Sequence, residues 1–302
     1  MSNAPRVLLA YLVLCVVWGS TYLVIRIGVQ ELPPALFAGV RFLLAGGVLL
    51  VWARATGRPL PRSRRDWVTN IVTGLALLFA ANGLVVWAEQ YVASGVAAIF
   101  VVTVALWLAV FDTVVPGSEK RVTWSQGAGL VMGLAGCVPL VGLNLEELRA
   151  ADWRGPVALL LATMCWAGGS VYSKRRPTAS GSHMNSAVQM LAGGVALLVL
   201  GTALGEWGRF HLTPRGIGAV AYLIVFGSLI GYTTYVYVLR HMTPTIAGTY
   251  AYVNTVVAVF LGWLVLGEPI GPRTLVSMGI VIGSVWWVRR GGGEKRSMKD
   301  EA

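Results

Sequence analysis

Two arginines interrupt long apolar runs near the start of the chain. Arg26 lies near the end of VWGSTYLVIRIGVQELPP (residues 17–34), and Arg41 lies within AGVRFLLAGGVLL (residues 38–50). A guanidinium group can hold a carboxylate through two parallel hydrogen bonds. A charged group inside an apolar span is costly, so it is expected to be paired or to serve a function. The two arginines are therefore candidates for ion pairs or for a site that binds a solute carboxylate.

Glu89, in VVWAEQYV, is the acid expected at a similar depth. Arg41 lies roughly 10 Å inside its apolar run when counted from Pro34 at ~1.5 Å per residue. Arg26 is nearer a helix end, from which a long side chain can extend to the interface. For Arg41 two interpretations stay open: an ion pair with Glu89, and a place on the wall of a solute cavity. They are compatible, because a solute carboxylate could replace Glu89 as the partner of Arg41.

Aromatic and amide side chains also recur inside the apolar runs. Trp18, Tyr22 and Arg26 are spaced four residues apart and so share one helix face. Trp166, Ser170 and Lys174 repeat that spacing. Each alone is expected to pack or hydrogen bond between helices, but together they could line a polar cavity. The candidate substrate-binding residues are Trp18, Tyr22, Arg41, Asn82, Trp166, Tyr232, Tyr252 and Asn254, and the candidate ion-pair or coupling residues are Arg26, Glu89 and Lys174.

The composition shows what kind of protein must position these residues. Of the 302 residues, 12% are charged and 56% are hydrophobic, and the mean hydropathy is +0.69. A soluble domain carries about 25% charged residues, so lipid must cover most of this surface. Cys15, Cys137 and Cys165 all fall in apolar runs, without the spacing of a disulfide framework or a metal site. We therefore expect an integral membrane protein with no bound metal.

Runs of about 20 apolar residues cross a bilayer as helices. Ten such runs are present, and the alternation typical of a β-barrel is absent. The sequence therefore predicts an all-α membrane protein with ten spans. They lie near residues 7–27, 34–53, 68–88, 94–114, 123–142, 154–173, 185–205, 216–237, 244–266 and 274–290.

The distribution of positive charge predicts the orientation of the chain. Seventeen of the 24 Lys and Arg residues fall in alternate loops, counted from the N-terminus, and five fall in the other loops. Cytoplasmic loops collect Lys and Arg, so both termini are predicted to be cytoplasmic, with 291–302 as a cytoplasmic tail. The net charge of +11 follows from this bias and does not indicate nucleic-acid binding.

The two halves of the sequence repeat each other. With a shift of about 148 residues Trp18 falls on Trp166, Arg26 on Lys174, and LLAGGVLL close to MLAGGVALL. Residues 1–145 and 150–290 are the predicted repeats, each with five spans. Because five is odd, the two repeats must have opposite orientations in the membrane. Inverted repeats with a site at their interface are typical of transporters.

The segments WGSTYLVIRIGV and PPALFAGVRFLLAGG resemble the first repeat of the EamA branch of the drug/metabolite transporter superfamily. AVAYLIVFGSLIGYTTYVYVLR, AGTYAYVN and VAVFLGWLVLGEPI resemble the second repeat. The resemblance covers residues 10 to 288 or so. It implies ten helices in two inverted five-helix repeats, and an inner-membrane exporter of amino acids or other small metabolites.

The chain departs from the family pattern in the fourth span of each repeat. The family often has proline there, whereas this chain has Ala105 in TVALW and Thr255 in YVNTVVAV. Proline interrupts a helix by removing a backbone hydrogen bond. Its absence from both halves argues against a shared kink at these positions, and against rocking that depends on one.

The resemblance and the buried arginine together predict a carrier that exports amino acids or related carboxylates by alternating access. No Asp or Glu lies near the middle of a span, so Glu89 is the only candidate coupling group and facilitated or weakly coupled export is favoured. The alternatives are a carrier of drugs, sugars or nucleosides, and less readily a channel or an intramembrane enzyme. The expected setting is the bacterial inner membrane, with solute and lipid as partners, no cofactor, no nucleic acid and a monomeric state.

Overall fold

The computed structural model describes residues 4–92, 94–116, 122–142, 152–266 and 270–291, and the regular elements in these ranges are helices. The predicted tail beyond residue 291 lies outside them. In the first half the elements are α1 (Ala4–Glu31), α2 (Pro34–Ala55), α3 (Arg64–Gly74), η1 (Leu75–Ala81), α4 (Asn82–Ala88), α5 (Ser94–Val102), α6 (Val104–Val114) and α7 (Trp124–Val141). In the second half they are α9 (Arg154–Arg175), α10 (Ser182–Ala203), η2 (Glu206–Arg209), α11 (Pro214–Tyr222), η3 (Leu223–Tyr232), α12 (Thr233–His241), α13 (Pro244–Gly248), α14 (Tyr250–Leu266) and α15 (Pro272–Gly291).

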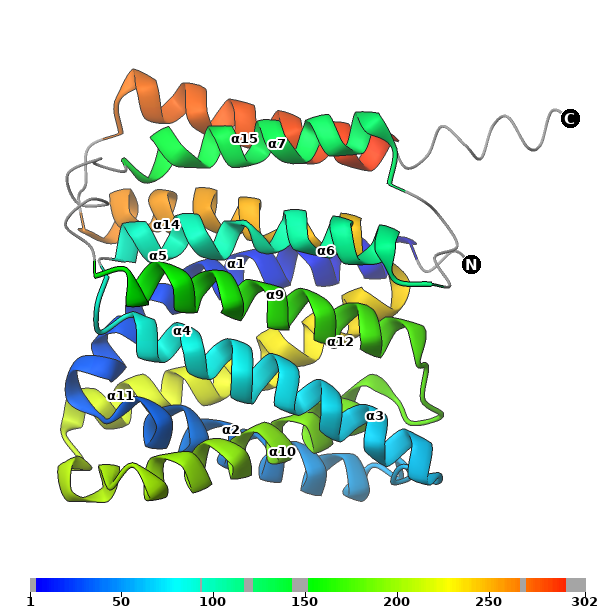
Figure 1. Ribbon diagram of the computed structural model, residues 1–302, viewed down its shortest axis with the longest axis vertical. Helices are drawn as coiled ribbons and strands as arrows, with labels where there is room; N and C mark the ends of the chain where they lie inside the picture. The colour runs from blue at the N-terminus through cyan, green and yellow to red at the C-terminus, as the bar shows by residue number, and fades with distance from the viewer. Residues whose placement is uncertain (1–3, 93, 117–121, 143–151, 267–269, 292–302) are drawn as a thin grey trace, which may run out of the picture.

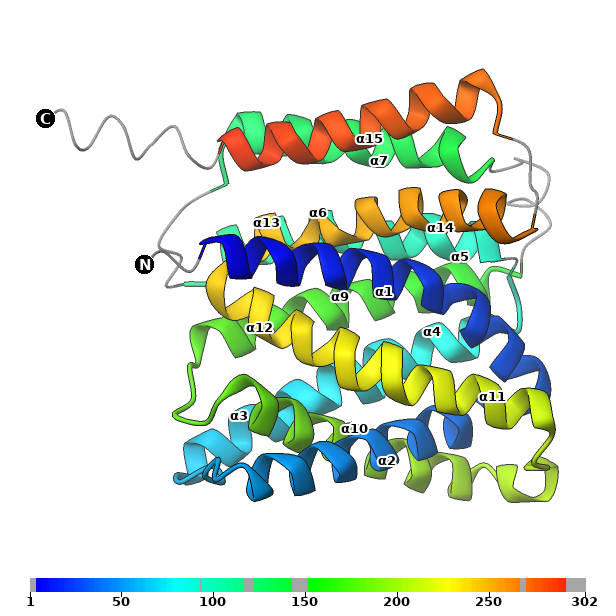
Figure 2. The ribbon, with the colours of Figure 1, turned by 180° about the vertical axis from the view of Figure 1, so that it is seen from behind.

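These elements form ten spanning segments. In the described residues nine helices are long and apolar enough to cross a membrane. The tenth segment is α15, whose 20 residues carry arginines near both ends and which runs alongside α7 (Figures 1 and 2). The predicted ten-helix, inverted-repeat fold is therefore confirmed.

Equivalent helices of the two repeats pack against each other. Helix α2 lies along α10 at one end of the bundle, and α7 lies along α15 at the other (Figure 1). The repeated LAGG motif makes the first contact possible. A Cβ atom on Gly46 would lie 3.0 Å from the backbone nitrogen of Leu191, and one on Gly194 would lie 2.8 Å from that of Leu43. The two contacts are related by the same shift of 148 residues, so glycine permits a symmetric close approach.

The irregular parts of the helices also follow the repeat. The third span of each half contains a π-helical segment, η1 in the first and η3 in the second. The fourth span is interrupted at Thr103 in the first half and at Thr249 in the second. Neither interruption needs proline. The hydroxyl of Thr103 donates to the carbonyl of Phe100 at 2.6 Å, and that of Thr249 to the carbonyl of Ile246 at 2.7 Å. Helices α6 and α14 run through Ala105 and Thr255 without interruption, so the two breaks lie at other positions than the missing prolines.

The beginning of α1 and the end of α15 lie on the same side of the bundle (Figure 1). We call this side the terminal face and the other the opposite face. Helices α6, α9 and α12 end at the terminal face, whereas α1 and α4 end at the opposite face. Since each span connects the two faces, the position of a residue along its helix gives its depth.

Candidate functional site

A cavity of about 110 Å³ lies between the two repeats. Its walls come from α1, α2, η1, α4, α5 and α6 of the first half and from α9, η3 and α14 of the second. We call it the central cavity. Five of the predicted substrate-binding residues line it: Trp18, Arg41, Asn82, Trp166 and Tyr232.

Arg41 contributes a nearly inaccessible guanidinium group to this wall, because only 3% of the residue is exposed. Its Nη2 atom donates to Oδ1 of Asn82 at 2.9 Å, and its Cζ atom lies 4.1 Å from the centroid of the Phe42 ring. Its Nε atom has no hydrogen-bond partner among the described residues. A buried donor without a partner is costly, so the wall retains the capacity to bind an acceptor.

The predicted ion pair between Arg41 and Glu89 is not formed. The described residues contain two ion pairs within 4.0 Å, Arg154–Asp152 and Arg175–Asp112. Glu89 is 7% exposed, and its Oε2 atom lacks a hydrogen-bond partner in the described structure. The side-chain partner of Arg41 is Asn82 instead of Glu89. Asn82 lies two helical turns deeper in the bundle than Glu89.

Arg26 is half-buried at the opposite face. Its Nη1 atom approaches the carbonyl oxygen of Val92 at 3.4 Å. The repeat-equivalent Lys174 makes the corresponding contact at the terminal face, where its Nζ atom donates to the carbonyl oxygen of Arg240 at 2.7 Å. Val92 and Arg240 are themselves 148 residues apart, so the repeat preserves the acceptor as well as the cation.

Four aromatic residues close the central cavity on the side of the terminal face. The ring centroids of Trp18 and Trp166 are 5.5 Å apart, and those of Tyr235 and Tyr250 are also 5.5 Å apart. The indole of Trp166 donates to the hydroxyl of Tyr235 at 3.0 Å, and the indole of Trp18 donates to a main-chain carbonyl of η3 at 3.0 Å. Contacts of this kind fix the rings in place. We call these four residues the aromatic layer.

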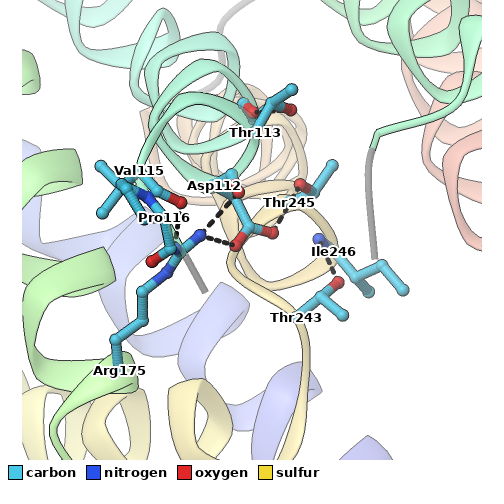
Figure 3. Close-up of polar contacts among 9 residues, drawn as sticks. Asp112, Thr113, Val115, Pro116, Arg175, Thr243, Thr245 and Ile246 are labelled. Atoms are coloured by element: carbon cyan, nitrogen blue, oxygen red, sulfur yellow. Dashed lines mark hydrogen bonds and ion pairs between the residues drawn. The ribbon is translucent and has the colours of Figure 1, made fainter. Parts of the chain in front are cut away.

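A second cavity of about 650 Å³ lies beyond the aromatic layer, at the terminal face. It is bounded by the ends of α6, α9 and α12, and we call it the vestibule. Arg175 reaches across from α9 to Asp112 of α6, with Nη2 and Oδ1 3.3 Å apart (Figure 3). Asp112 also accepts from Thr245 of α13 at 3.4 Å. Lys174, predicted as an ion-pair or coupling residue, lies in this vestibule and not in the central cavity.

A chain of buried hydrogen bonds links the wall of the central cavity to the vestibule. It starts at Tyr232, which lines the central cavity, and ends at Thr178, which lines the vestibule. Its bonds are Tyr232 Oη to Gln189 Oε1 at 2.7 Å, Gln189 Nε2 to Asn70 Oδ1 at 2.9 Å, Asn70 Nδ2 to Asn185 Oδ1 at 3.2 Å and Asn185 Nδ2 to Thr178 Oγ1 at 2.8 Å. Residues from both repeats take part, so the chain joins the two halves.

Two predicted residues lie away from the central cavity. The hydroxyl of Tyr252 donates to the carbonyl of Leu130 at 2.7 Å, which places Tyr252 between α14 and α7. The amide of Asn254 lies 3.0 Å from the carbonyl oxygens of Cys15 and Tyr250, to which its nitrogen can donate. Both are structural helix–helix contacts. The side chain of Tyr22 lies outside the described part of the structure.

The sequence-based prediction missed several polar residues of the central cavity. Thr21, Thr163 and Tyr250 line its wall, and Gln189 holds the hydroxyl of Tyr232. Tyr250 stands in the same TYAYVN segment as the two misplaced residues, so the segment was identified and its inward-facing side was not. Within the described ranges, no three His, Cys, Asp or Glu side chains are grouped so as to hold a metal ion.

Known proteins resemble this chain both in sequence and in fold. The model of the EamA-like transporter family matches residues 5–142 and again residues 153–290. The chain is 39% identical over 284 residues to the uncharacterized inner membrane transporter YedA of Escherichia coli (strain K12), covering 93% of this chain and 90% of that protein. It is 23% identical to the uncharacterized transporter YoaV of Bacillus subtilis, over 88% of this chain and 90% of YoaV. A solved crystal structure with 20% sequence identity superimposes with a TM-score of 0.76 over 94% of this chain and 97% of the other.

Proposed function

Because the chain belongs to the EamA-like transporter family, we propose that it exports amino acids or related carboxylates across the bacterial inner membrane by alternating access. Membership of this family makes the chain a multi-pass membrane transporter and not an enzyme. The substrate class, the direction of transport and the mechanism go beyond family membership and are proposed here.

The observation that carries the proposed substrate is the guanidinium of Arg41 on the wall of the central cavity. The group is nearly fully buried and has one donor without a partner. In the described structure the guanidinium of Arg41 forms no ion pair within 4.0 Å. A solute carboxylate would balance its charge and supply the missing acceptor.

The proposed mechanism rests on the position of the cavity between inverted repeats, as expected for alternating access. The π-helical segments η1 and η3, and the interruptions at Thr103 and Thr249, occur in corresponding spans of both halves. Irregular helix geometry of this kind often marks functional hinges. In the proposed mechanism these segments bend, while the pairs α2 with α10 and α7 with α15 stay packed.

The proposed orientation places the terminal face in the cytoplasm, since Lys and Arg collect in the loops on that side. Outward transport is supported by the resemblance to exporters alone. Glu89 is the proposed coupling group if a proton is exchanged, because a buried acid can compete with a solute for a cation. Otherwise export is facilitated.

One observation favours a second candidate substrate. The wall of the central cavity is mostly apolar, with Ile25, Phe42, Leu78 and Val101 among its residues. A predominantly hydrophobic site also suits neutral or weakly polar drug-like compounds. A multidrug carrier would use these surfaces and depend little on Arg41.

Export is tested in cells preloaded with a panel of labelled amino acids and organic acids, with and without the protein. The proposal predicts faster loss of particular carboxylates from cells that contain the protein. An unchanged rate across the panel, with faster loss of a hydrophobic dye, would contradict it and favour the drug carrier.

A further inference from the structure

We propose that the vestibule is a second binding site, specific for an anionic group of the carboxylate or phosphate type and separate from the central cavity. The proposal does not depend on which solute is exported, because it rests on the charge and geometry of the terminal face.

Positive charge dominates the walls of the vestibule. Among the described residues the one carboxylate on the wall is Asp112, and this group is already engaged by Arg175 and by the hydroxyl of Thr245. Apart from this pair and from Lys174, the charges of Arg176 and Arg240 remain on the wall. The cationic residues that line the vestibule are Lys174, Arg175, Arg176 and Arg240.

Main-chain carbonyls hold Arg175, Lys174 and Arg240 in place. Arg175 donates to the carbonyl of Asp112 at 2.6 Å and also to the carbonyls of Val115 and Pro116 (Figure 3). Lys174 donates to the carbonyl of Arg240 at 2.7 Å, and Arg240 in turn donates to the carbonyl of Ser180 at 2.7 Å. A carbonyl oxygen carries no net charge, so the positive field stays. Cations fixed in this way have lost their conformational entropy before a ligand arrives.

Comparison of the two repeats separates the one cation that both repeats share from the cations found only in the second repeat. The contact of Lys174 with a helix end has its equivalent in the contact of Arg26 at the opposite face. The other three cations have no charged equivalent. A shift of 148 residues places Ile27, Gly28 and Val92 at the positions of Arg175, Arg176 and Arg240.

The topology of the membrane requires positive charge on one side of the bilayer, but it does not require that the charge surround one cavity. The eight-residue stretch between α2 and α3 shows the difference. Arg62 there is exposed at the same face and does not line the vestibule. The collection of cations around a cavity of about 650 Å³ is therefore best explained by an anionic ligand.

The aromatic layer separates this ligand from the central cavity. Along η3 and α12, Tyr232 lines the central cavity and Val236 and Leu239 line the vestibule. Tyr235 lies between them and is fully buried. Two sources fit the same chemistry: a free carboxylate or phosphate compound that enters from the aqueous phase, and the headgroup of an anionic phospholipid.

The test uses the full-length protein in nanodiscs of neutral phosphatidylcholine, titrated with inorganic phosphate or succinate while its thermal unfolding midpoint is followed. A ligand that binds only the folded state raises the midpoint. The informative variant is Arg176→Gln. The side chain of Arg176 is exposed and stacks on the ring of Tyr172 at 4.8 Å, so its removal leaves the carbonyl contacts of Arg175 and Lys174 in place. Arg62→Gln is the matched control, with the same loss of charge at the same face.

We expect the half-saturating concentration of the anion to rise about two- to fivefold in Arg176→Gln, as for loss of one partly screened charge contact, and to stay unchanged in Arg62→Gln. The lipid is tested in nanodiscs that contain phosphatidylglycerol, without added anion. If the lipid raises the unfolding midpoint, and raises it less in Arg176→Gln than in Arg62→Gln, the headgroup is the source of the anionic group.

Three results would overturn the proposal. The first is an equal change in Arg176→Gln and Arg62→Gln, which would indicate general surface charge. The second is the absence of any anion-dependent shift, from solute or from lipid, in the wild-type protein. The third is complete loss of the shift in Arg41→Gln with no loss in Arg176→Gln, which would place the anion in the central cavity.

Discussion

The two faces of the bundle share one contact that the repeat duplicates, and they differ in the charged residues around that contact. At each face the cation of a first helix, Arg26 or Lys174, meets a main-chain carbonyl at the end of a third span. At the terminal face the nearby acid is bound, because Asp112 is paired with Arg175. At the opposite face the acid is not bound directly, since Oε2 of Glu89 has no hydrogen-bond partner in the described structure.

This difference separates what the repeat builds from what the individual sequence adds. The shared contact fastens one span to the next in both halves, and it needs only a cation and a helix end. The additional charges have diverged. Those at the terminal face tie α6, α9 and α13 together, whereas Arg41 at the opposite side reaches into the central cavity with a donor to spare. Arg26, Lys174 and Arg175 each fasten one helix to another, whereas Arg41 keeps a buried donor without a partner in the described structure.

The largest expected effect comes from removing the cavity charge. In Arg41→Ala the efflux of carboxylates should fall about 100-fold, because a charge-assisted contact worth ~3 kcal/mol is lost. The matched control is Arg26→Ala, which removes a cation that meets a carbonyl at the same face. Initial efflux rates, normalised to the amount of protein in the membrane, measure both. Equal losses in the two variants would contradict the distinction between paired and available charge.

The next effect concerns the polar chain that connects the two regions. In Gln189→Leu the hydroxyl of Tyr232 and the amide oxygen of Asn70 both lose a buried partner. We expect the protein to be destabilised by about 2 kcal/mol, measured as a lower thermal unfolding midpoint in detergent. Gln90→Leu, at an exposed amide, is the control and should change little. Unaltered stability in Gln189→Leu would mean that the chain does not hold the repeats together.

The contact between α6 and α9 at the terminal face depends on Asp112. Asp112→Asn removes its ion pair with Arg175 in a partly buried setting, which should weaken this contact by about 1 kcal/mol. The readout is alkylation of a cysteine introduced as Leu239→Cys on the wall of the vestibule, and the rate should rise about fivefold. Asp152→Asn, which disrupts the exposed pair with Arg154, should leave the rate unchanged. A faster reaction in both variants would remove the special role of Asp112.

The smallest effect is expected at the unpaired acid. In Glu89→Gln a negative charge near Arg41 disappears, so carboxylates should bind about threefold more tightly, a change typical of partly screened charges. The KM for the exported carboxylate in proteoliposomes measures this change. A raised KM would show instead that Glu89 contacts the solute, for example through an ammonium group.

The fold and the main features of the site could be predicted from the sequence because they depend on local or repeated patterns. Apolar runs gave the spans, and the motifs around Gly46 and Gly194 gave the repeat. Arg41 and Asn82 were recognised as cavity residues because polar groups are rare at that depth.

The partners of the predicted residues could not be predicted, since they depend on how each helix is rotated and tilted. Tyr250, Tyr252 and Asn254 fall within five residues of α14, and only Tyr250 lines the cavity. The contact of Gln189 with Asn70 joins residues that are 119 positions apart. No local sequence pattern predicts such a contact. The interruption at Thr103 was missed for a different reason. A threonine hydroxyl that bonds back to its own helix can replace proline, and threonine is common in such spans.

The central claim is that Arg41 binds the carboxylate of the solute in the central cavity. The most direct measurement is equilibrium binding of the solute identified in the efflux panel, compared with its uncharged carboxamide, to the wild-type protein and to Arg41→Gln. The account predicts that the wild-type protein prefers the carboxylate by about 100-fold, and that Arg41→Gln binds both compounds with similar, weak affinity. An undiminished preference for the carboxylate in Arg41→Gln would contradict the account and assign the carboxylate to another group.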